Sequence, residues 1–214
     1  MGAARLVADL LVPPRCLGCR TAVDTALCGA CRRAAEALAL PDLGRTVLAP
    51  GVLALGAYAY DGVVRDALVT LKVGGAVGHG AGLGVLLRER IPLPAGVAVT
   101  WLPSTGRRRR QRGAELTRAL AGPGAVPLLR RTAGRPDQTS LDPAARRRSP
   151  AGSFAALGPA PPAVVLVDDI RTTGATAAAA AAALLAAGAR RVVVVTLAVA
   201  GDAARAAAGA TPRA

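Results

Sequence analysis

A continuous apolar run that ends in two carboxylates limits the fold more than any other feature of the chain. The run is Val164-Val165-Leu166-Val167, and Asp168 and Asp169 follow it. Consecutive apolar residues rich in valine are typical of a strand that is buried on both faces, and such strands occur in parallel sheets covered by helices. An alanine-rich stretch then runs to Gly188 and predicts a helix. We therefore expect an α/β domain with a parallel sheet.

A turn rich in threonine and glycine lies between the acid pair and the predicted helix. It contains Arg171, Thr172, Thr173, Gly174, Ala175 and Thr176. The first N–H groups of a helix have no partner within the helix, and its dipole favours an anion at this end. Gly174 lets the backbone approach a ligand, and the threonine hydroxyls can donate hydrogen bonds. The acid pair can accept hydrogen bonds from sugar hydroxyls, directly or through Mg²⁺. These features together indicate a phosphorylated ribose as ligand.

Residues 164–176 resemble the signature with which type I phosphoribosyltransferases bind 5-phosphoribosyl 1-diphosphate (PRPP). The signature is four apolar residues, two acids, an apolar residue, any residue, and Thr-Thr-Gly-x-Thr, and the segment fits it at every position. The resemblance implies a type I phosphoribosyltransferase-like parallel sheet flanked by helices, with PRPP and Mg²⁺ as ligands. By the resemblance, Asp168 and Asp169 hold the ribose 2- and 3-hydroxyls, and residues 171–176 hold the 5-phosphate. The alternative is a doubly wound domain with an acid pair, as in receiver domains, which lack the threonine-glycine turn.

Four cysteines near the start of the chain form two pairs with metal-ligand spacing. They are Cys16, Cys19, Cys28 and Cys31. Two Cys-x-x-Cys pairs suit a tetrahedral zinc site with four sulfur ligands, which leaves no open position and is therefore structural. Disulfides are the alternative, and the absence of an export signal disfavours them. A module of this size has too small a core to fold without the metal.

A cysteine module before a phosphoribosyltransferase-like domain resembles the ComF family, which is associated with DNA uptake in competent bacteria. Tyr60-Asp61-Gly62, Leu71-Lys72, Leu102-Pro103 and Arg112-Gly113 agree with that family, as does the series Gln138, Leu141, Arg147 and Phe154. The resemblance covers almost the whole chain.

Clusters of arginine follow two predicted strands. The first contains Arg107, Arg108, Arg109, Arg110 and Arg112, where the resemblance places a pyrophosphate loop. Dense positive charge is what a leaving pyrophosphate requires. Lys72, at the end of a predicted helix, is expected to reach the same phosphates; the alternative is a cation that caps the helix. The second cluster, within residues 130–153, corresponds by resemblance to an active-site hood. Either cluster is alternatively a solvated or nucleic-acid-facing loop.

The rest of the chain predicts one α/β domain between two small appendages. We expect a cysteine module at 1–36, a linker at 37–50, the main domain at 51–200 and a disordered tail at 201–214. Strands are predicted at 52–60, 97–102, 125–129, 163–168 and 191–198, and helices at 62–72, from about 80 to 90, at 112–121 and at 173–187.

A formal net charge of +14 favours anionic partners. No signal peptide or transmembrane segment is recognisable, so a cytoplasmic protein without membrane insertion is expected. Two functions follow. The first is an enzyme that transfers a phosphoribosyl group from PRPP to an unidentified acceptor. The second is a non-catalytic protein that binds PRPP or a related nucleotide and associates with single-stranded DNA or with competence or DNA-processing proteins.

Overall fold

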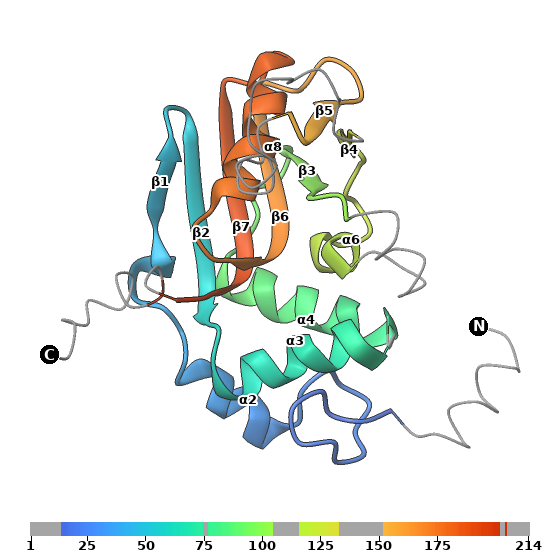
Figure 1. Cartoon of the computed structure of the whole chain (residues 1–214). Helices are drawn as coiled ribbons and strands as arrows, with labels where there is room; N and C mark the ends of the chain where they lie inside the picture. Colours follow the sequence, from blue (N-terminus) through green and yellow to red (C-terminus); the bar gives the residue numbers. More distant parts are fainter. Residues whose placement is uncertain (1–13, 75–76, 105–115, 133–151, 202–203, 205–214) are drawn as a thin grey trace, which may run out of the picture.

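A five-stranded sheet forms the centre of the computed structural model, which describes residues 14–74, 77–104, 116–132, 152–201 and 204 (Figure 1). The strand order is β1-β2-β7-β6-β3. In that order the strands span Thr46–Ala49, Val52–Ala59, Arg191–Val199, Ala163–Arg171 and Ala98–Trp101. β1 pairs antiparallel with β2, and the other neighbours are parallel. The expected α/β fold with a mostly parallel sheet is thus confirmed.

Helices cover both faces of this sheet. On one face, Val165 and Val167 of β6 join a core cluster with side chains from α3 (Gly62–Gly74), α4 (Val77–Arg90) and α6 (Leu116–Ala121). On the other face, Val164 and Leu166 pack with α8 (Ala175–Ala186). Because successive residues of a strand point to opposite faces, a strand covered on both sides must be apolar at every position.

The segment expected to be a linker contributes to the sheet. It contains a short 3-10 turn, η1 (Pro41–Gly44), and the edge strand β1, which forms a hairpin with β2. Leu40 N–H donates to the Ala57 carbonyl and Ala59 N–H donates to the Leu38 carbonyl, so the chain before η1 also lies along β2. The proline and glycine residues of this segment form the turns at the two ends of β1.

The strand predicted at 125–129 is displaced toward the C-terminus. The observed strand β4 (Leu129–Arg131) pairs antiparallel with β5 (Phe154–Ala156), which was not predicted. Val126 N–H donates to the Val99 carbonyl of β3, but the next N–H on the same side, that of Leu128, donates to the side-chain Oγ1 atom of Thr100 over 3.2 Å and not to a backbone carbonyl. The chain therefore contacts the sheet edge at Val126 and forms a regular strand only from Leu129 onward.

The cysteine segment packs against the main body of the chain. Its helix α2 (Gly29–Glu36) contacts α3, and Leu17 belongs to the same core cluster as α3 and α4. Glu36 accepts a hydrogen bond from the hydroxyl of Tyr58, which is fully buried on β2. The proposed division into domains stays a prediction. Within the described part of the chain, no helix combines the length and apolar character needed to cross a lipid bilayer.

Candidate functional site

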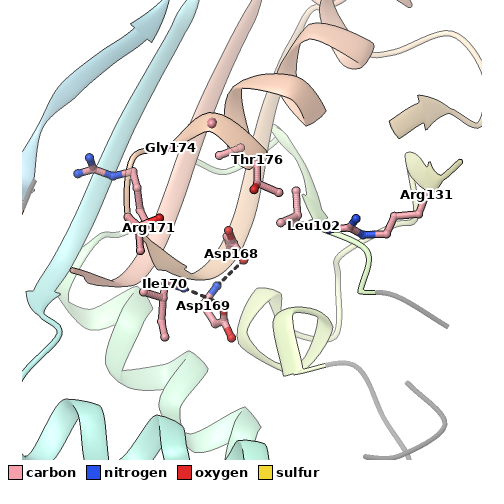
Figure 2. A pocket seen from close by; sticks show the side chains of 11 residues that line it. Leu102, Arg131, Asp168, Asp169, Ile170, Arg171, Gly174 and Thr176 are labelled. Carbon is pink, nitrogen blue, oxygen red and sulfur yellow. Dashed lines mark hydrogen bonds between the residues drawn. The ribbon is translucent and has the colours of Figure 1, made fainter. Parts of the chain in front are cut away.

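A pocket of about 200 Å³ lies beyond the carboxyl end of β6 (Figure 2). The residues that line it are Leu102, Arg131, Asp168, Asp169, Ile170, Arg171, Thr172, Gly174, Ala175, Thr176 and Ala177. The predicted acid pair and most of the predicted phosphate turn therefore line one pocket, at the edge of the sheet where ligands of parallel sheets bind. Thr173 is exposed at the same turn, and its Oγ1 accepts a hydrogen bond from the Ala175 N–H over 3.3 Å.

Asp168 is the buried acid of the pair. Its side chain points toward the turn that carries Gly174 and Thr176 (Figure 2), and Oδ1 accepts a hydrogen bond from the Asp169 N–H over 2.8 Å. Burial, and then the neighbouring charge of Asp169, raises the pKa of Asp168 to about 8, although the charge of Lys72 opposes the rise. A carboxyl group with this pKa is mostly protonated at neutral pH, and a ligand whose hydroxyls donate to it would favour the ionised form.

Asp169 points away from the turn (Figure 2), and its partner is Lys72 of α3. Its Oδ2 lies 2.7 Å from the Nζ atom of Lys72, and its Oδ1 accepts a hydrogen bond from the Ile170 N–H over 2.8 Å. The structure thus places Lys72 beside the acid pair, at the C-terminal part of α3. The predicted contact between Lys72 and pyrophosphate stays a prediction.

The turn after β6 enters α8 through a glycine whose backbone is left-handed. Gly174 caps α8 at φ +81°, in the left-handed region, and a Cβ atom built there would lie 2.6 Å from Cδ2 of Leu48. Only glycine fits both conditions. Thr172, Ala175 and Thr176 are exposed at the start of the helix, where backbone N–H groups are not needed by the helix itself.

Arg171 lines the pocket, but its guanidinium group turns away from Asp168 (Figure 2). Its Nη2 atom donates to the carbonyl oxygen of Gly44 over 2.8 Å, and burial lowers the pKa of the guanidinium group. Within the described residues its buried Nε atom has no hydrogen-bond partner. The side chain therefore joins the end of β6 to η1 in addition to lining the pocket.

Two pocket residues were not singled out as site residues. Leu102 lies between Asp168 and Arg131 (Figure 2), at the end of β3. Arg131 donates from Nε to the Pro103 carbonyl over 2.9 Å, and its guanidinium carbon lies 4.7 Å from the centroid of the Phe154 ring. Arg131 appeared in the sequence only as one arginine of a long polar stretch, and its pairing across β4 and β5 is what brings it to the pocket.

The predicted pyrophosphate arginines, Arg107 to Arg110 and Arg112, lie outside the described residues. The chain that leads to them is described as far as Ser104. The Leu102 carbonyl accepts a hydrogen bond from Thr117 Oγ1 of α6, so both ends of the segment 105–115 start near the pocket.

The acid pair, as arranged, does not fit a divalent cation shared by both carboxylates. The ammonium group of Lys72, 2.7 Å from Asp169 Oδ2, places a positive charge where Mg²⁺ would bind this carboxylate, and the Oδ1 atom of each acid already accepts a backbone N–H. Mg²⁺ prefers several oxygen ligands in a near-octahedral arrangement.

The four cysteines converge on one point, as their spacing predicts. Their sulfur atoms lie within 4.8 Å of one another, and Cys19 Sγ is 3.6 Å from Cys28 Sγ. Zinc–sulfur bonds of about 2.3 Å in a tetrahedron separate the sulfurs by roughly 3.8 Å. The cluster can therefore hold a metal ion, and zinc fits its four sulfur ligands.

Local hydrogen bonds distribute negative charge unevenly over these thiols. Burial raises the pKa of Cys16, but N–H donors of Cys28, Cys19 and Gly18 outweigh it and leave the pKa lowered. The Thr21 hydroxyl and N–H lower the pKa of Cys19 to about 6. Burial, and then Cys16, raises the pKa of Cys31 to about 12. N–H donors that point at cysteine sulfur are suited to thiolate ligands, whose charge a metal ion then neutralises.

A comparison with models of protein families finds none that matches the chain. A comparison with curated proteins also finds no match.

Proposed function

We propose that this chain binds PRPP, as a member of the ComF family with a type I phosphoribosyltransferase-like domain, and transfers the phosphoribosyl group to an acceptor. The observation that carries the proposal is the position of Asp168. It is a buried carboxyl group that faces the glycine turn at the start of α8, inside a pocket at the carboxyl edge of the sheet.

Each part of PRPP has a matching part of the pocket. The 5-phosphate suits the first turn of α8, where backbone N–H groups and the helix dipole favour an anion. The ribose hydroxyls suit Asp168 and Asp169, which follow one another at the end of β6. The diphosphate is then directed toward Leu102 and the segment that contains Arg107 to Arg110.

The transfer step follows from this placement. A nitrogen lone pair of the acceptor forms a bond to C1 of the ribose, and the bond between C1 and the diphosphate oxygen breaks. The electron pair of the broken bond leaves with pyrophosphate, and the acceptor nitrogen releases its proton to solvent. The chain contributes by orienting the ribose and by stabilising the leaving charge with arginine, so no side chain acts as nucleophile.

The alternative function is a non-catalytic nucleic-acid-associated protein in which PRPP or a nucleotide is a regulatory ligand. The net charge of +14 favours this alternative. The two functions share the pocket and differ in whether pyrophosphate is released.

The test is calorimetric titration of the zinc-loaded chain with PRPP. We expect Asp168→Asn to weaken binding about tenfold to a hundredfold, because hydrogen bonds to charged groups contribute about 1.5–3 kcal/mol. Asp66→Asn is the matched control, since Asp66 is exposed on α3 and lies outside the pocket. Equal affinities in Asp168→Asn and the native chain would contradict the proposal. Pyrophosphate release with a panel of nitrogenous bases then separates the enzyme from the binding protein.

A further inference from the structure

Lys72 is the single lysine of a chain with 27 lysine and arginine residues. Every other basic side chain is arginine, whose flat guanidinium group carries five donors in a fixed fork. A lysine ammonium group is instead a compact and strongly hydrated point charge, which resembles a small metal cation more closely. The one lysine of the chain therefore lies beside the acid pair.

The contact that Lys72 makes is short and partly shielded from solvent. Its Nζ atom lies 2.7 Å from Asp169 Oδ2, and the two side chains are only 25% and 19% exposed. The other oxygen of Asp169 accepts the Ile170 N–H. Asp169 is therefore satisfied by the protein alone on both oxygens.

The same contact reduces the repulsion between the two neighbouring carboxylates. Two adjacent carboxylates at the end of one strand repel each other when both are ionised, and a site of this kind needs a nearby positive charge. α3 supplies that charge from the side of the sheet opposite to α8, because Leu68 and Leu71 fix the helix in the core.

We propose that Lys72 is the built-in counter-ion of the acid pair and takes the place of a divalent cation on Asp169. The ribose hydroxyls then bind carboxylates that the ammonium group has already oriented, and the chain itself holds no Mg²⁺ at this site. The inference rests on the proposed function, because it describes how the same carboxylates are prepared for a ribose ligand. Its consequence is that a ribose ligand without a diphosphate binds equally well with and without divalent cations.

The test measures binding of Mn²⁺ to the zinc-loaded full chain by electron paramagnetic resonance, with Mn²⁺ as the probe for Mg²⁺. We expect the native chain to leave the signal of free Mn²⁺ unchanged. Lys72→Met should gain Mn²⁺ affinity by at least about tenfold, and the added substitution Asp169→Asn should remove the gain. Lys72→Arg keeps the positive charge and should continue to exclude Mn²⁺.

Arg65→Met is the matched control, because Arg65 is an exposed cation on the same helix. Circular dichroism confirms that each variant is folded. Native protein that binds Mn²⁺ and loses it in Asp169→Asn would overturn the inference, as would Lys72→Met that gains no affinity. If Lys72→Met does not fold, Lys72→Gln, which also removes the charge and keeps a polar end, takes its place with the same expected gain.

A second arm titrates ribose 5-phosphate in the presence of Mg²⁺ or of a chelator too weak to strip the cysteine site. Equal affinities support the inference, and a strict requirement for Mg²⁺ overturns it. If neither ribose 5-phosphate nor PRPP binds, the proposed function fails, while the Mn²⁺ measurement still decides the role of Lys72.

Discussion

Single residues determine the shape of the pocket, and Gly174 is the clearest case. It combines a left-handed backbone with a close approach to Leu48 of the edge strand β1. The sequence predicted a glycine that brings the backbone near a ligand. The structure adds that the same glycine lets β1 pack beneath the turn, which no local pattern of residues could reveal.

Gly174→Ala is expected to destabilise the turn by two separable effects. The left-handed backbone costs an L-residue roughly 1–2 kcal/mol, and overpacking against Leu48 costs about 1–3 kcal/mol more. Thermal unfolding of the purified chain measures the sum. Gly96→Ala provides the control for backbone strain alone, because Gly96 has φ +76° and nothing within 4 Å of a new Cβ atom. A loss in Gly174→Ala no larger than that in Gly96→Ala would contradict the packing argument.

At the scale of elements, strong local patterns predicted the structure well and weak ones did not. The apolar runs of β6 and β7 and the alanine stretch of α8 lie close to where they were predicted. β5 has only three residues and becomes a strand through its partner β4, so its sequence carries little signal. β1 was not predicted, because the proline and glycine residues on both sides of it indicated a linker.

In the candidate site, too, some residues could be predicted from a local pattern and others could not. The motif itself placed Asp168, Asp169 and the turn in one pocket, because those residues are consecutive in the chain. Arg131, and the ion pair between Lys72 and Asp169, depend on contacts between distant segments. Such contacts are set by the packing of whole elements, and a single sequence does not display them.

The packing of the cysteine segment on α3 gives a prediction at this scale. A Cβ atom on Gly18 would lie 2.5 Å from Cγ2 of Val63 and 2.9 Å from the sulfur of Cys31. Gly18→Ala should therefore displace Cys31 of the cysteine cluster or the start of α3, at a cost of about 1–3 kcal/mol. We expect less zinc per chain by elemental analysis and a lower unfolding temperature.

Two variants sharpen that measurement. Gly29→Ala is the matched control, because its nearest neighbour is the flexible end of Arg33 at 3.7 Å. Adding Val63→Ala to Gly18→Ala should restore part of the zinc content, since it removes the closer of the two contacts. The same zinc content in Gly18→Ala and Gly29→Ala would show that the cysteine cluster tolerates the shift.

At the scale of the whole molecule, the excess of positive charge favours a nucleic-acid partner, but it also serves the transfer of a phosphoribosyl group. A charge of +14 attracts PRPP, pyrophosphate and nucleic acid alike. The location of the charge relative to the pocket is more informative than its total. The segment that contains Arg107 to Arg110 departs from Leu102 and Pro103, and Thr117 and Arg131 hold these two residues beside the pocket.

Neutralising two of these arginines separates the functions. If they serve a pyrophosphate site, the double variant Arg108→Gln and Arg109→Gln should weaken PRPP and pyrophosphate binding with little effect on DNA affinity. If they follow a nucleic-acid backbone, PRPP binding should persist. The salt dependence of single-stranded DNA binding should then fall by about 0.7 in log–log slope for each lost phosphate contact.

The double variant Arg33→Gln and Arg65→Gln removes the same charge from exposed positions on α2 and α3, outside the pocket lining. It controls for the general effect of net charge, which lowers affinity for every anion. We expect the first outcome, because the arginine segment and the phosphate turn begin on neighbouring strands at the same edge of the sheet. Unchanged PRPP affinity together with a reduced DNA salt slope would reverse that assignment.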